Sequence, residues 1–141
     1  MDTILHGVDI HATPEKVFAA VATASGLSSW WSTSVTAEER LGGRVKFQFI
    51  PDFNPEMEIT EFSQPAVVAW KCVDGAAPWQ GATIGFAIRP AADGSSRLTF
   101  TQRYAGDIPD DAYGTFNYNW GYYLHSLQQY LETGQGTPHP A

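Results

Sequence analysis

The chain has 141 residues, of which 43% are hydrophobic and 13% aromatic. This length suits one domain with a single core, and the apolar content excludes an intrinsically disordered chain. The formal net charge of −7 would repel a nucleic-acid backbone or an anionic membrane surface, so we expect neither as a partner.

Cysteine usage and the first residues bear on the compartment. Cys72 is the sole cysteine, which excludes an internal disulfide and fits a reducing environment. The N-terminus shows no basic region followed by an apolar run, and no stretch reaches the length of a membrane span. We therefore expect a cytoplasmic protein.

The first elements are a strand and two short helices. Residues 3–11 alternate in polarity, which predicts a strand with His6 on its apolar face. Thr13, directly before a proline, predicts the N-cap of a helix. The pair Trp30 and Trp31 follows in a second short helix or turn.

From residue 40 onward, short alternating runs separated by turn residues predict a meandering antiparallel sheet. Asp93-Gly94 is a strong hairpin signal. A bulge or strand end is expected near Glu61, which faces inward only if the register continues past it. Trp79 lies in a Gly/Ala/Pro loop and could cap a cavity. The residues expected on the inner face of the sheet are Phe47, Phe49, Met57, Trp70, Cys72, Phe86, Gln102 and Tyr104.

The longest periodic stretch predicts a helix from about residue 111 to 132. Gly134 is its expected C-cap, and the Gly/Pro tail from about residue 134 is expected to be flexible. The apolar stripe of this helix includes Phe116, Trp120 and Tyr123.

A sheet with one apolar face must bury that face, and the last helix is the long amphipathic element that can cover it. One helix does not fill the concavity of a curved sheet. We therefore predict an α+β helix-grip fold: a curved antiparallel sheet around a long C-terminal helix, with two short helices after strand one. The fold would enclose a hydrophobic cavity within one domain, residues 1–141. The alternative is a solid core filled by the large rings.

Polar residues on the inner face suggest acid/base chemistry. His6, Glu61, Gln102 and Tyr104 could surround one cavity, where desolvation can tune a pKa for proton transfer. Satisfied structural pairs are the alternative explanation. The histidine spacing does not fit a metal site, and no cofactor motif is present, so we expect neither a metal nor a cofactor.

Five segments carry a family resemblance through their order and spacing: ATPEKVF at 12–18, LSSWW at 27–31, GGR at 42–44, QP at 64–65, and NWGYYL with YLETG between 119 and 134. Together they resemble the START/Bet v 1-like (SRPBCC) superfamily, and within it the branch named activator of heat-shock protein 90 ATPase homologue-like. The resemblance implies a helix-grip fold with a deep hydrophobic cavity for lipids, sterols, polyketides or other aromatic molecules.

Three functions follow as hypotheses. The first is binding of a small hydrophobic or aromatic ligand, in stress response or secondary metabolism. The second is a polyketide cyclase/aromatase-like or hydrolase-like enzyme, and the third is a co-chaperone that stimulates a heat-shock protein 90 ATPase. The candidate cavity residues are His6, Trp30, Trp31, Phe47, Phe49, Met57, Glu61, Trp70, Trp79, Phe86, Gln102, Tyr104, Phe116, Trp120 and Tyr123.

Overall fold

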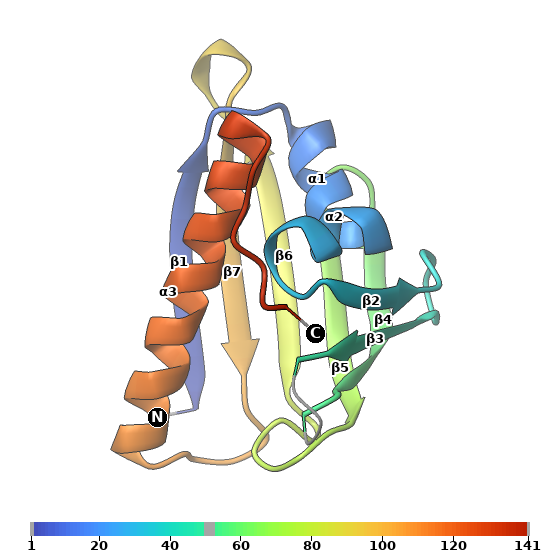
Figure 1. Cartoon of the computed structure of the whole chain (residues 1–141), viewed down its shortest axis with the longest axis vertical. Coiled ribbons are helices and arrows are strands. Elements are labelled where there is room, and N and C mark those ends of the chain that lie inside the picture. The colour runs from blue at the N-terminus through green and yellow to red at the C-terminus, as the bar shows by residue number, and fades with distance from the viewer. Residues whose placement is uncertain (1, 50–52, 141) are drawn as a thin grey trace.

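A computed structural model describes residues 2–49 and 53–140. These residues form one antiparallel sheet of seven strands in the order β1-β7-β6-β5-β4-β3-β2, with helices on one face (Figure 1). The strands are β1 (Thr3–Ile10), β2 (Ser34–Ala37), β3 (Arg44–Gln48), β4 (Glu56–Ser63), β5 (Val67–Asp74), β6 (Thr83–Pro90) and β7 (Ser96–Arg103). The α-helices are α1 (Pro14–Ala22), α2 (Ala24–Trp30) and α3 (Asp110–Thr133), and a 3-10 turn, η1 (Ala92–Gly94), joins β6 to β7.

The helices divide the inner face of the sheet between them. The long helix α3 packs against β1, whereas α1 packs against β5 and β6 (Figure 1). Together they leave the sheet curved around α3, so the predicted α+β helix-grip architecture is confirmed.

The predicted N-cap of the first short helix is confirmed, and the Trp30-Trp31 pair lies at the end of a second one. Thr13 is the N-cap of α1, and its side-chain oxygen accepts from the Lys16 N–H at 3.4 Å. Thr23 caps α2 in the same way, with its hydroxyl oxygen 3.0 Å from the Gly26 nitrogen. Thr23 alone separates α1 from α2, and Trp31, directly after α2, stacks on Trp70 of the sheet with ring centroids 6.3 Å apart.

The bulge expected near Glu61 is present in β4, and it changes the orientation of Glu61. Ile59 pairs with Trp70 and Glu61 pairs with Ala69, so Thr60 is an extra residue in the ladder. Since side chains alternate along a strand, the extra residue reverses which side chains face inward. Glu61 is exposed, and the expectation that it faces a cavity is wrong.

The hairpin and helix-end signals are also confirmed. Asp93 and Gly94 have φ angles of 60° and 74°, as a tight β6–β7 connection requires. Gly134 ends α3 in the left-handed conformation, with a φ of 86°, and its N–H donates to the Tyr130 carbonyl at 2.8 Å.

The C-terminal tail (residues 134–140), whose Gly/Pro content predicts flexibility, makes hydrogen bonds to other parts of the chain. The Thr137 N–H donates to Ser126 Oγ at 2.7 Å, and the His139 N–H donates to the Trp31 carbonyl at 2.8 Å. Gly136 is buried so tightly that a Cβ there would lie 2.5 Å from the Ser29 carbonyl oxygen. These partners are distant in sequence, so composition could not reveal them.

Large rings fill much of the space between the sheet and the helices. Phe86 on β6 has its ring centroid 5.3 Å from that of Trp70 and 5.4 Å from that of Phe100. Trp30 approaches Phe86 edge-on at 6.2 Å. All four side chains are fully buried, so the solid-core alternative holds for this part of the molecule.

Candidate functional site

A pocket of about 390 Å³ remains at one end of the aromatic core. Its walls come from the middle of α3, the Trp79 loop (residues 75–81), Trp31 at the end of α2, Phe49 and Phe53 after β3, and the C-terminal tail. Thus the helix-grip core is solid in one part and hollow in another. The lining residues are Trp31, Phe49, Phe53, Ala76, Ala77, Pro78, Trp79, Phe116, Asn119, Trp120, Tyr123 and His139.

Trp31 forms the inner wall of the pocket. Its ring centroid lies 4.8 Å from that of Trp120 on α3 and 5.1 Å from that of Phe49 beyond β3. Trp79 stacks nearby, with centroids 6.3 Å from Trp31 and 6.2 Å from Trp120. Aromatic faces from four chain segments therefore converge on one pocket.

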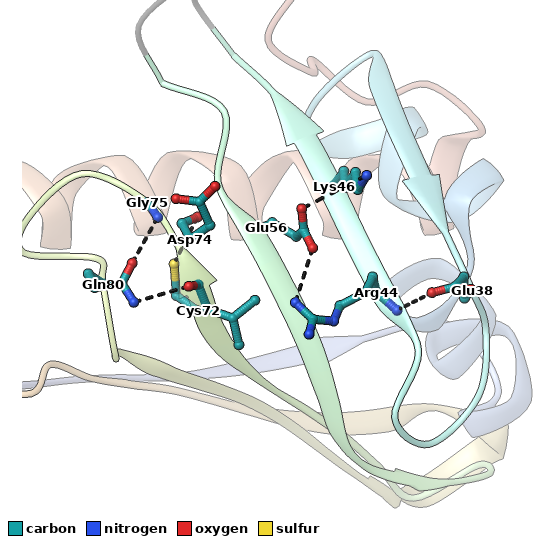
Figure 2. Close-up of polar contacts among 9 residues, drawn as sticks. Glu38, Arg44, Lys46, Glu56, Cys72, Asp74, Gly75 and Gln80 are labelled. Carbon is teal, nitrogen blue, oxygen red and sulfur yellow. Dashed lines mark hydrogen bonds and ion pairs between the residues drawn. The ribbon is translucent and has the colours of Figure 1, made fainter.

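The Trp79 loop is fastened at its base by one amide side chain. Gln80 Oε1 accepts from the Gly75 N–H and Gln80 Nε2 donates to the Val73 carbonyl, both at 3.1 Å (Figure 2). A Cβ on Gly75 would lie 2.9 Å from Cys72 Sγ, so the loop approaches the sheet closely there. This anchoring keeps Trp79 buried, at 8% exposure, as a wall of the pocket.

Cys72 lies under the base of this loop. The thiol donates to the Asp74 carbonyl, with sulfur and oxygen 3.6 Å apart (Figure 2). Burial raises the pKa of the Cys72 thiol, which keeps it protonated and poorly nucleophilic. Cys72 therefore has the structural role expected from its inward position on β5.

A separate charged cluster lies on β3 and β4. Glu56 pairs with Arg44 at 3.1 Å and with Lys46 at 3.9 Å, and Glu38 Oε1 accepts from the Arg44 N–H at 2.9 Å (Figure 2). The Arg44 and Lys46 side chains are 44% and 64% exposed, so these pairs contribute little to stability. None of these residues lines the pocket.

A buried amide lies behind the pocket wall. Gln102 Oε1 accepts from Trp120 Nε1–H at 2.6 Å and from the Tyr104 hydroxyl at 2.8 Å. An indole N–H can only donate, so this contact fixes which end of the amide faces Trp120. Gln102 Nε2 is buried and has no hydrogen-bond partner among the described residues. Burial raises the pKa of Tyr104 far above its usual value, so its hydroxyl stays protonated.

His6 lies apart from the pocket, under α3. A Cβ on Gly121 would lie 3.8 Å from His6 Cε1, so this helical glycine packs over the imidazole ring. Nε2 of His6 is buried and without a hydrogen-bond partner among the described residues. With Glu61 exposed and Tyr104 paired to Gln102, the four predicted acid/base residues do not surround one cavity.

Apart from His6 and Glu61, the predicted cavity residues form two groups. Six line the pocket: Trp31, Phe49, Trp79, Phe116, Trp120 and Tyr123. Seven lie in the core behind it: Trp30, Phe47, Met57, Trp70, Phe86, Gln102 and Tyr104. Sequence reasoning missed Phe53, Ala76, Ala77, Pro78, Asn119 and His139, which lie in loops, in the tail or on the polar side of the helical stripe.

Three lining residues bring polar groups other than indole nitrogens to the pocket. Asn119 lies exposed on α3, and Tyr123 follows it by one helical turn. Burial, and to a lesser degree the neighbouring Tyr122, raises the pKa of Tyr123. His139 Nδ1 is buried without a hydrogen-bond partner among the described residues. None of the described lining residues is an acid, a lysine or an arginine.

Possible metal ligands and the length of the helices within residues 2–49 and 53–140 also bear on function. No group of three or more His, Cys, Asp or Glu side chains is placed to hold a metal ion. No helix in this part of the chain is long and apolar enough to cross a membrane.

Comparison with known proteins gives one family match and several structural relatives. The family described as "Activator of Hsp90 ATPase homolog 1-like protein" matches residues 11–132. No curated protein matches the sequence. The solution structure of the Aha1 dimer from Colwellia psychrerythraea is 27% identical, with a TM-score of 0.84 over 96% of this chain and 100% of that one.

Two more distant structures share the fold. DynU16, a protein in the dynemicin biosynthetic locus, is 20% identical, with a TM-score of 0.81 over 96% of this chain and 49% of its own. CalU16 from Micromonospora echinospora is 12% identical, with a TM-score of 0.76 over 92% of this chain and 74% of its own. At these identities the likeness speaks for the fold alone.

Proposed function

Because the chain belongs to the activator of Hsp90 ATPase homolog 1-like family, as its sequence segments predicted, we propose that it binds a small hydrophobic or aromatic ligand in the Trp31 pocket. The observation that carries this proposal is the pocket itself. Its volume of about 390 Å³ falls within the range of small-molecule sites, and aromatic rings form most of its lining.

The construction of the pocket supports binding over incomplete packing. The Trp79 loop and the C-terminal tail are both held by hydrogen bonds within the chain, which fix the walls of the pocket. A preformed apolar site loses little conformational entropy when a ligand enters. The aromatic rings of the lining are held around the pocket and do not fill it.

The test uses Prodan, an uncharged naphthalene dye whose fluorescence rises in apolar surroundings. Asn119→Trp would fill the mouth of the pocket, whereas Tyr118→Trp adds the same ring at a position on α3 that is 74% exposed and outside the lining. We expect Prodan to bind the native protein and Tyr118→Trp, and to bind Asn119→Trp about tenfold more weakly or worse, since enclosure supplies most of the affinity. Equal binding to both variants, or no binding to the native protein, would refute the proposal.

Stimulation of a heat-shock protein 90 ATPase is the second candidate, favoured by the family match. Its test is the ATPase rate of that chaperone with and without the purified protein. The acid/base enzyme hypothesis loses its support, because His6, Glu61 and Tyr104 do not share the pocket.

A further inference from the structure

The most informative group in the pocket is the imidazole of His139, carried by the C-terminal tail. Its Nδ1 is buried and has no hydrogen-bond partner among the described residues, although His139 lines the pocket. Buried polar atoms are nearly always paired, because an unpaired one has lost its hydrogen bonds to water without gaining others. An unpaired ring nitrogen beside an apolar pocket is therefore a position for a ligand's polar atom.

The backbone, and not the side chain, holds His139 in place. Its N–H donates to the Trp31 carbonyl at 2.8 Å, and its carbonyl accepts from the Thr33 N–H at 3.1 Å, forming a bridge to Ser32. The imidazole ring then packs edge-on against Phe49, with centroids 5.9 Å apart. The ring is positioned without a hydrogen bond to Nδ1, so this atom has no partner to lose when a ligand pairs with it.

The chemistry of the lining restricts the ligand. No described lining residue is an acid, a lysine or an arginine, and the whole chain carries a net charge of −7. A carboxylate or phosphate would lose its hydration without gaining an opposite charge, which is strongly unfavourable. An uncharged ligand fits these surroundings better than an anion does.

The two tautomers of a neutral imidazole indicate which polar group the ligand carries. Nδ1 accepts a hydrogen bond in one tautomer and donates one in the other. A hydroxyl group can both donate and accept, so it satisfies either tautomer. A ketone oxygen only accepts, and so it satisfies just one.

We propose that His139 selects uncharged aromatic ligands that carry a hydroxyl group, by pairing that hydroxyl with Nδ1 while the surrounding rings take the aromatic body. This inference rests on the proposed function and adds the ligand class and the residue that determines it. The C-terminal tail thereby becomes part of the binding site.

The experiment compares two probes of nearly the same shape, naphthol and methylnaphthalene substituted at the same ring position. Each displaces Prodan, and the measured quantity is the ratio of their inhibition constants. A hydroxyl costs more to desolvate than a methyl group, so the ratio in one protein reflects desolvation as well as the hydrogen bond. The change in the ratio between native protein and variant isolates the contribution of the side chain. His139→Phe keeps a ring of similar size, and His125→Phe is the matched control at an exposed position on α3.

We expect the preference for naphthol to fall by about fivefold to tenfold in His139→Phe, the effect of one net hydrogen bond. It should be unchanged in His125→Phe. His139→Asn, which keeps a polar side chain, should retain part of the preference. Thermal melts of each variant check that the fold is intact.

The outcomes separate this inference from the proposed function. If Prodan does not bind the native protein, the proposed function fails and this inference fails with it. If Prodan binds in the pocket but the naphthol preference is the same in native protein, His139→Phe and His139→Asn, only this inference is overturned. Tighter binding of naphthoate than of naphthol to the native protein would also overturn it.

Discussion

The aromatic core around Phe86 and the pocket around Trp31 are built from the same kinds of side chain but from different parts of the fold. In the core, Trp70, Phe86 and Phe100 come from the adjacent strands β5, β6 and β7 and meet with no space left between them. Around the pocket, the rings come from the end of α2, from α3, from two loops and from the tail. Hydrogen bonds to the backbone fasten the Trp79 loop and the tail in place.

The core and the pocket therefore contribute differently to stability and to binding. Neighbouring strands are 4.7–4.9 Å apart in general, so inward rings on them must touch. Loops and tails carry no such spacing, and their separation depends on anchors such as Gln80 and Ser126. We therefore expect substitutions in the core to affect unfolding and those at the anchors to affect the pocket.

The largest contrast should come from truncating one ring in each region. Phe86→Ala should lower the free energy of unfolding by about 3–5 kcal/mol, because it leaves a cavity in a fully buried site. Phe116→Ala should cost about 1 kcal/mol, since Phe116 is half-buried beside existing space. Chemical denaturation measures both values, and Prodan binding should weaken in Phe116→Ala alone. Equal losses of stability would mean that the pocket end is packed as tightly as the core.

A smaller effect is expected from releasing the tail. Gly136→Ala places a Cβ against the Ser29 carbonyl, so the tail must shift, at a cost of about 1–3 kcal/mol. The amides of Thr137 and His139 should then lose protection in hydrogen exchange. Gly114→Ala, where a Cβ meets nothing within 4 Å on α3, is the control and should be neutral or stabilising. Unchanged protection in Gly136→Ala would show that the tail is not held as described.

The smallest effect on stability, about 1 kcal/mol, is expected from Gln80→Ala, which removes two hydrogen bonds near the surface. The Trp79 loop would then have to be ordered by the ligand, so Prodan affinity should fall by about threefold. Gln48→Ala, at an exposed position on β3, is the comparison and should change neither quantity appreciably. If Prodan affinity is the same in Gln80→Ala as in the native protein, the hydrogen bonds of Gln80 do not contribute to the pocket as described.

Local sequence signals predicted the elements well because their causes are local. The N-cap at Thr13, the left-handed residue Gly134 and the hairpin at Asp93 each depend on a few neighbouring residues. Strand alternation likewise placed Trp70, Phe86 and Gln102 on the buried face, since it needs only the period of the backbone. The family segments extended this to the fold as a whole.

The tertiary structure alone decided which buried residues line empty space. One extra residue in β4 turns Glu61 outward, and a sequence pattern shows only that the phase breaks near it. His139 reaches the pocket through hydrogen bonds to Trp31 and Thr33, far away in the chain, and such contacts leave no periodic trace. The sequence by itself determined that rings would face inward, and the packing of loops and tail determined where those rings leave room for a ligand.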